Sequence, residues 1–107
     1  MSFSEYLQGI GLGTFVSFDL ETTGLDPKVD FVIEFGAVKI VNGVATERYQ
    51  QFIKPPVRIP KFITKLTGIT NEMVEDAPTF EEVVDDLYDF LGDHPLVAHN
   101  IYFDHNF

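Results

Sequence analysis

The chain has 107 residues, of which 45% are hydrophobic, and its 17 acidic and 7 basic side chains give a formal net charge of −10. This length allows one domain, and the 11 phenylalanines and 4 tyrosines supply ample apolar surface for a packed core. The absence of cysteine excludes a disulfide framework and a thiolate metal site. The negative balance disfavours a protein that binds nucleic acid through a broad basic face, but bound metal cations would supply positive charge locally.

Targeting and membrane signals are missing from the sequence. No stretch has the length and apolar character of a membrane span, and residues 1–13 contain no Lys or Arg. We therefore expect a cytoplasmic location and no membrane partner. Residues 1–13 also have no clear periodicity, so we expect them to be a lead-in to a domain that covers residues 14–107.

Three strands are predicted in the first half of the chain, at residues 14–20, 31–41 and 44–53. A turn around Asp26 and Pro27 separates the first two strands. Asn42 and Gly43 join the second and third, and this pair is the strongest short hairpin signal because both central positions of a type I′ turn need positive φ. The cross-strand pairs that this turn predicts are Val41 with Val44, Lys39 with Thr46, Ala37 with Arg48, and Ile33 with Phe52.

The second half of the chain is predicted to be mainly helical. Residues 54–60 contain three prolines and form a loop, and two short helical pieces follow, at about 61–67 and between Thr70 or Asn71 and Pro78. Thr79 and Glu82 make a capping box for a helix that runs to about residue 91. The apolar stripe of this helix, which we expect to face the core, contains Phe80, Val83, Val84, Leu87, Tyr88 and Leu91.

The last part of the chain completes an α/β arrangement. Residues 95–98 are predicted to be a short buried strand, and a helix is predicted to start at Ile101. The expected architecture is a mixed β-sheet that starts as an antiparallel three-stranded meander and is flanked by helices.

Two carboxylates, Asp19 and Glu21, lie at the end of the first apolar strand. Successive side chains alternate between the faces of a strand, so these two point to one side while Phe18 and Leu20 point to the other. Two anions about 4 Å apart repel by up to ~4 kcal/mol at an effective dielectric near 20. The pair therefore either lies in open water, as a solvated strand end, or binds a cation such as Mg²⁺ or Mn²⁺, which prefers oxygen ligands.

Four segments, taken in order, resemble the DEDD superfamily of 3′→5′ exonucleases, which have the ribonuclease H-like fold. Within it the resemblance is to the DEDDh type, and especially to the proofreading exonuclease of PolC-type bacterial DNA polymerase III, and it spans about residues 15–107. The segments are FDLETTG (18–24), IEFGAVK (33–39), LTGIT (66–70) and VAHNIYFD (97–104).

This resemblance implies a 3′→5′ exodeoxyribonuclease that removes nucleotides from DNA 3′ ends with two divalent cations, Mg²⁺ or Mn²⁺. Asp19 would bridge both ions, Glu21 would bind one of them, and Asp104 would be the acidic residue of the second motif. The implied partners are a single-stranded or frayed DNA 3′ end and the polymerase part or other subunits of DNA polymerase III. The implied substrate-binding residues are Leu20, Thr22, Thr23, Gly24, Leu66, His99, Asn100 and Phe103.

The superfamily also has a third motif, with a general-base histidine and a fourth acidic ligand, well downstream of the second. The sequence ends three residues after Asp104. We therefore expect a domain truncated before its third motif, with the carboxy-terminal part of the fold missing and no activity on its own. We interpret His99 as a hydrogen-bonded histidine at a strand end in preference to a substitute base, and Glu34 as a structural hydrogen-bond acceptor in preference to a metal ligand.

Other functions stay open at this level. A ribonuclease-type DEDD exonuclease is one, because recognition of the 2′-OH depends on pocket walls that the sequence does not define. A haloacid dehalogenase-like phosphatase has a similar strand-end motif, but its second acid is Asp where this chain has Glu21, and it lacks the 99–104 motif. The third alternative is a catalytically inactive fragment or interaction module that keeps the fold.

Overall fold

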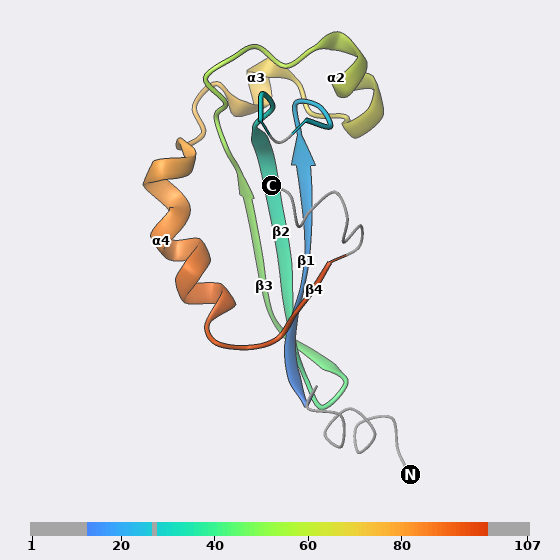
Figure 1. The fold of residues 1–107 in the computed structure, drawn as a ribbon, viewed down its shortest axis with the longest axis vertical. Coiled ribbons are helices and arrows are strands. Elements are labelled where there is room, and N and C mark those ends of the chain that lie inside the picture. The colour runs from blue at the N-terminus through green and yellow to red at the C-terminus, as the bar shows by residue number, and fades with distance from the viewer. Residues whose placement is uncertain (1–12, 27, 99–107) are drawn as a thin grey trace.

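The computed structural model describes residues 13–26 and 28–98, which form one four-stranded sheet, a helix on one of its faces and two short helices at one end (Figure 1). The strands are β1 (Thr14–Thr22), β2 (Val32–Val41), β3 (Val44–Phe52) and β4 (Leu96–Ala98), arranged in the order β3-β2-β1-β4. The first three form an antiparallel meander, and β4 is parallel to β1. The predicted mixed sheet is therefore confirmed. The helix predicted from Ile101 onward lies outside the described residues.

The hairpin between β2 and β3 turns at Asn42 and Gly43, as predicted. Both residues have positive φ, 51° and 83°, as a type I′ turn requires. The predicted register holds for Val41 with Val44 and continues to Ile40 with Ala45, but it changes from Lys39 onward, because a bulge lies between the pairs made by Lys39 and Ile40. The observed pairs include Val41 with Val44, Lys39 with Glu47, Val38 with Arg48, Ala37 with Tyr49, and Glu34 with Phe52.

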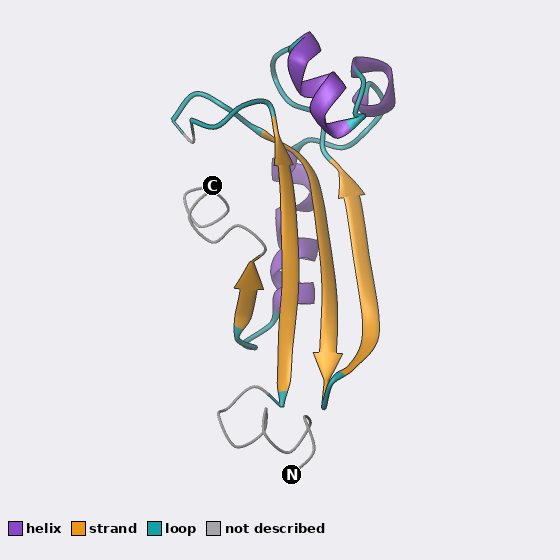
Figure 2. Cartoon of the chain, turned by 90° about the vertical axis from the view of Figure 1, so that its right-hand side faces the viewer, coloured by secondary structure: helices purple, strands orange, loops and turns teal. Residues whose placement is uncertain are grey.

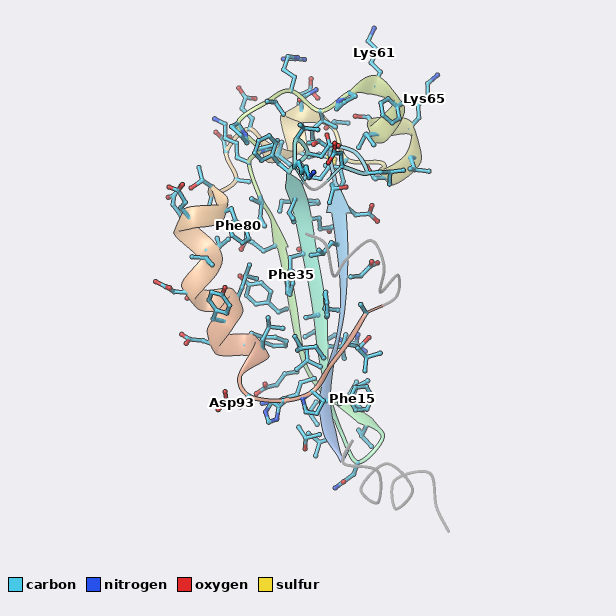
Figure 3. All side chains as sticks on the ribbon, in the orientation of Figure 1. Phe15, Phe35, Lys61, Lys65, Phe80 and Asp93 are labelled. Atoms are coloured by element: carbon cyan, nitrogen blue, oxygen red, sulfur yellow. The ribbon has the colours of Figure 1, made fainter. Side chains whose placement is uncertain are left out.

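The main core lies between the sheet and α4 (Phe80–Leu91), which covers one face (Figure 2). Its buried members are Val16, Leu20, Phe35, Ala37, Ile53, Val83 and Leu87. The predicted stripe of α4 is only partly buried: Val83 and Leu87 point to the sheet, whereas Phe80 is 47% and Tyr88 69% exposed. The described sheet covers only part of this six-residue stripe, and the rest of the stripe faces solvent. Figure 3 shows Phe80 at the start of the helix and Phe35 on the sheet that it covers.

A second core lies at the end of the sheet where β1 ends, under α2 (Lys61–Thr67) and α3 (Asn71–Val74) (Figure 2). A bulge between Glu21 and Thr22 pairs Thr22 with Val32, so that Ile33 is left out of the ladder. Ile33 is fully buried in this second cluster, whereas Val32 packs against the first. The other buried members of the second cluster are Ile59, Ile63, Ile69 and Val74.

The strand predicted at residues 95–98 forms, but it is not buried. Leu96 is 49% and Val97 41% exposed, which corrects the prediction. The reason is that β4 pairs with β1 alone among the described strands, at the edge of the sheet, and α4 lies toward the β3 side in Figure 1.

Candidate active site

The two carboxylates of β1 lie on the face of the sheet opposite α4. Leu20 is buried in the α4 core, and the alternation of β1 places Asp19 and Glu21 on the other face, with Asp19 exposed and Glu21 half-buried. Asp19 is opposite Gly36 of β2, which has no side chain to cover it. The backbone N–H of Leu20 donates a hydrogen bond to Asp19 Oδ1 (3.0 Å). The prediction that these carboxylates share one face is therefore confirmed.

Glu34 adds a third carboxylate to this face, directly opposite Glu21 in the ladder. Like charges at opposite positions destabilise a sheet. Glu34 Oε2, however, accepts a hydrogen bond from the side-chain amide of Gln50 on β3 (2.6 Å). This contact confirms the prediction that Glu34 is a structural hydrogen-bond acceptor.

The Thr-Thr-Gly turn that follows β1 is fixed by its own hydrogen bonds. Thr22 and Thr23 are 4% and 2% exposed. The Thr22 hydroxyl donates to the carbonyl of Gly24, and the Thr23 hydroxyl donates to Asp30 Oδ1 (3.1 Å) and accepts from the N–H of Phe31 (2.9 Å). Both hydroxyl protons therefore serve the fold, and the Thr23 N–H is also engaged, because it donates to the carbonyl of Phe31 (2.8 Å).

Asp30 stabilises this turn, a structural role that was not predicted from the sequence. Its carboxylate accepts hydrogen bonds from the Thr23 hydroxyl and from the N–H of Asp26 (3.0 Å), and it lies against Gly24. A Cβ on Gly24 would be 2.3 Å from Asp30 Oδ2. The only signal in the sequence was the preference of Asp for turns, which does not identify its partners.

The parallel pairing of β4 with β1 ends one ladder position before Asp19. Ala98, the last residue of β4, pairs with Phe18, one position before Asp19. Asp104 follows six residues later, and six residues span at most about 20 Å. The predicted site residues His99, Asn100, Phe103 and Asp104 lie outside the described residues.

Asp19 and Glu21 offer the carboxylate oxygens that Mg²⁺ and Mn²⁺ prefer. Within residues 13–26 and 28–98, no group of three or more His, Cys, Asp or Glu side chains is arranged to bind a metal ion. Asp104, which the resemblance implies as a further ligand, lies outside these ranges. The donor chemistry fits a hard divalent cation.

Leu66, a predicted substrate-binding residue, is 79% exposed in the last turn of α2. The turn after it is held by the Thr67 hydroxyl, which donates to the carbonyl of Ile63 (2.8 Å) and accepts from the N–H of Ile69 (3.1 Å). Gly68 ends the helix with a φ of 79°. The LTGIT segment is thus a rigid turn that presents an apolar side chain to solvent.

Comparison with protein families and curated sequences identifies the class. The family model named RNase T and described as exonuclease matches residues 16–107. The PolC-type DNA polymerase III of Thermotoga maritima is 48% identical over 97 residues, which cover 91% of this chain and 7% of that protein. The 3′-5′ exonuclease DinG of Bacillus subtilis is 48% identical over 94 residues, 87% of this chain and 10% of that protein. The chain thus spans a tenth or less of these relatives.

Solved structures give the same result. Exonuclease X in complex with 5′ overhanging duplex DNA superposes with a TM-score of 0.74 at 28% identity, covering 86% of this chain and 52% of that one. The nuclease domain of 3′hExo, a DEDDh family member bound to rAMP, has a TM-score of 0.73 at 26% identity, covering 85% and 54%. The fold is therefore the ribonuclease H-like fold of DEDDh exonucleases.

The chain belongs to the RNase T exonuclease family, and its sequence is homologous to part of PolC-type DNA polymerase III. Exonucleases of this family use divalent metal ions. In the described part of the chain, no helix is long and apolar enough to span a membrane.

Proposed function

We propose that this chain contributes to the active site of a 3′→5′ exonuclease that removes nucleotides from DNA 3′ ends with two Mg²⁺ or Mn²⁺ ions. The observation that carries the proposal is the pairing of β1 with β4. In this pairing Ala98, the last residue of β4, lies opposite Phe18, so the chain that continues from Ala98 to Asp104 is long enough to reach the two carboxylates of β1. When bound, two such cations activate a water molecule and stabilise the leaving 3′ oxygen.

The roles of the residues follow from their positions. Asp19 and Glu21 would bind the cations from one face of β1, and Asp104 would add a third carboxylate. The backbone of residues 22–24 would border the terminal nucleotide, together with His99, Asn100 and Phe103, and the exposed Leu66 would pack on its base. The side chain of Leu20 is buried in the α4 core on the opposite face of the sheet, so we assign it no contact with the nucleotide. His94, the only histidine among the described residues, precedes β4, whereas the carboxylates lie level with its end or beyond it. We therefore assign the general base to no described residue.

Replacing Asp19 tests this function. In the full-length protein that carries this sequence, Asp19→Asn removes one charge and keeps the side-chain shape. Loss of a preorganised charged group at a reacting centre costs about 10²–10³ in kcat, so we expect digestion of a 5′-labelled single-stranded DNA with Mg²⁺ or Mn²⁺ to fall by at least that factor.

The matched control is Asp89→Asn, which makes the same chemical change on the exposed surface of α4. It should leave the rate unchanged. Full activity of Asp19→Asn, or equal losses in both variants, would contradict the assignment of Asp19 to the site.

The structure of the nucleic acid end provides a second prediction. Residues 22–24 offer backbone groups and no cation, and Leu66 offers apolar surface, so the site suits a frayed terminus in preference to duplex. Unpairing a matched end costs free energy. Single strands and mispaired ends should therefore be digested faster than matched blunt ends, measured by gel or by release of labelled nucleotides. Equal rates would oppose this prediction, and faster digestion of RNA would favour the ribonuclease-type alternative.

The cellular role that we propose is proofreading beside a bacterial DNA polymerase III, in the cytoplasm. The homology to PolC-type polymerase III supports this role. It predicts that a mismatched primer end is trimmed before the polymerase extends it. Extension with the mismatch retained in the product would argue against proofreading and for a separate exonuclease, as in the relative DinG.

A further inference from the structure

Basic residues are unevenly distributed in this acidic chain. Residues 54–65 contain no Asp or Glu, and four of the seven basic residues of the chain fall there. They are Lys54, Arg58, Lys61 and Lys65. This segment includes α2 and the loop before it, so the positive charge gathers at one end of the molecule.

Two of these cations are more available than the others. Lys54 and Arg58 line a groove that two acidic residues, Glu72 and Glu75, also line. Lys61 and Lys65 instead extend from the outer surface of α2 into solvent (Figure 3). The single ion pair found among residues 13–26 and 28–98 joins Lys39 and Glu47, so neither lysine of α2 is paired with a described carboxylate.

An exposed aromatic ring lies next to these lysines. Phe62 is 65% exposed and precedes the exposed Leu66 by one helical turn, just as Lys61 precedes Lys65. Ile63, on the other side of α2, is 4% exposed and anchors the helix in the second core. The helix, anchored through Ile63, therefore presents an exposed aromatic ring beside two cations.

This surface of α2 lies at the end of the sheet where β1 ends, next to the turn that borders the candidate active site. Ile63 packs in one cluster with Ile33, and Ile33 is adjacent to Val32, the pairing partner of Thr22. Figure 1 shows α2 at the same end of the molecule as the turn that follows β1. A strand whose 3′ end reaches that turn would have its next nucleotides near α2.

We propose that Lys61, Phe62 and Lys65, here called the α2 patch, bind the single-stranded nucleic acid just upstream of its 3′ terminus. The lysines contact phosphates and the phenylalanine ring stacks on a base, the combination by which proteins bind single strands without sequence preference. Charge complementarity favours a nucleic acid as the ligand of this patch. Two lysines without an ion-pair partner among the described residues, on a chain of net charge −10, suit a polyanion better than an apolar protein surface. The proposal rests on the exonuclease function proposed above.

Binding of a fluorescein-labelled 12-nucleotide oligothymidylate to the full-length protein in EDTA tests the α2 patch. For single strands, log K falls with log salt by about 0.7 per phosphate contact, so the Lys61→Gln/Lys65→Gln variant should lose about 1.4 from the slope. If the affinities converge at 1 M salt, the variant binds about 25-fold more weakly at 0.1 M. The control, Lys39→Gln, removes an ion-paired lysine near the hairpin turn, at the other end of the sheet, and should leave the slope unchanged.

The aromatic ring is tested separately from the charges. Phe62→Ala should weaken binding by roughly 5- to 150-fold, the effect of losing one stacked base, without changing the salt slope. Phe62→Tyr keeps the ring and should bind as the wild type does. Circular dichroism checks that each variant is folded. Wild-type affinity and salt slope in the double-lysine variant would overturn the proposal, as would wild-type affinity in Phe62→Ala. It would also be overturned if the α2 patch bound a protein, independently of salt, and did not bind the oligonucleotide.

A small substrate separates this proposal from the exonuclease function. The p-nitrophenyl ester of thymidine 5′-phosphate corresponds to the terminal nucleotide alone and lacks the upstream nucleotides that the α2 patch would bind, so its Mn²⁺-dependent hydrolysis should be equal in wild type and all α2 patch variants. Absence of hydrolysis in the wild-type protein would refute the exonuclease proposal, while the binding data would still decide the patch. Reduced hydrolysis in the patch variants would show that α2 acts on the catalytic centre, and would refute the upstream role.

Discussion

Gly24 and Asp30 determine the shape of the turn that borders the candidate site. The Asp30 carboxylate occupies the space beside Gly24 and accepts hydrogen bonds from Thr23 and Asp26. Any side chain at position 24 would have to displace that carboxylate. Because Thr23 also bonds to Phe31, a displacement of Asp30 would be transmitted to the start of β2.

We predict that Gly24→Ala destabilises the domain by about 1–3 kcal/mol, the cost of leaving buried hydrogen-bonding groups unsatisfied. It should also lower exonuclease activity, because the turn follows directly from the strand that carries Asp19 and Glu21. Urea unfolding and oligonucleotide digestion measure the two effects. The matched control is Gly36→Ala: a Cβ there meets nothing within 4 Å, so the stability should change by no more than about 0.5 kcal/mol. Equal losses of stability in the two variants would contradict this account of the turn.

At the scale of elements, α4 depends on the contacts at its first turn. The Glu82 carboxylate accepts hydrogen bonds from the N–H and the hydroxyl of Thr79, both at 3.0 Å. The backbone hydrogen bond, followed by that of the hydroxyl, lowers the pKa of Glu82 from its ordinary value of 4.5. The predicted capping box is confirmed.

This pKa shift predicts a pH dependence of stability. A carboxyl whose pKa is lowered by folding stabilises the native state above the unfolded pKa, and that contribution disappears as the pH falls through the folded pKa. Wild type should therefore have a higher midpoint of unfolding than Glu82→Gln at pH 7, and the difference should shrink in acid, where the wild-type carboxyl is itself protonated. Glu81→Gln, an exposed neighbour, is the control. A difference that is constant with pH would show that charge at residue 82 is not the cause.

The elements also show where prediction from the sequence stops. Strands, helices and the hairpin turn were predictable because Asn42-Gly43, the capping box and the alternation of β1 are local signals. The register beyond the hairpin bulge was not, because β3 is mostly exposed and its sequence has no buried face to fix the pairing. The bulge that sends Ile33 into the second core was missed for a similar reason: its effect depends on isoleucines of α2 and the flanking loops, far along the chain.

The candidate site was predictable to the same extent. The shared face of Asp19 and Glu21 follows from strand periodicity, and the structural hydrogen bond of Glu34 was inferred correctly. The bonds that engage the hydroxyls of Thr22 and Thr23 were not inferred, because Asp30 reaches Thr23 only through the geometry of the turn. The convergence of Asp104 on the other carboxylates stays a prediction.

At the scale of the whole molecule, the carboxylates on the sheet face opposite α4 should make the free energy of unfolding depend on metal binding. Asp19, Glu21 and Glu34 repel one another in the folded state, and a bound cation relieves this repulsion. Mn²⁺ at 100 times its dissociation constant should stabilise the full-length protein by about 2.7 kcal/mol. Thermal unfolding with Mn²⁺ or EDTA measures the effect, and Asp19→Asn should reduce it. A shift of equal size in that variant would place the ion elsewhere.

The bulge in the hairpin also affects the association of this chain with further copies of itself. β3 is an outer strand of the sheet, and the backbone N–H and C=O groups along such an edge invite pairing with a second chain. The bulge interrupts the regular ladder near the turn, and Glu47 and Arg48 place exposed charges just after it. An incoming strand would find neither a straight edge nor an apolar one there, so this irregularity protects the protein against aggregation through β3.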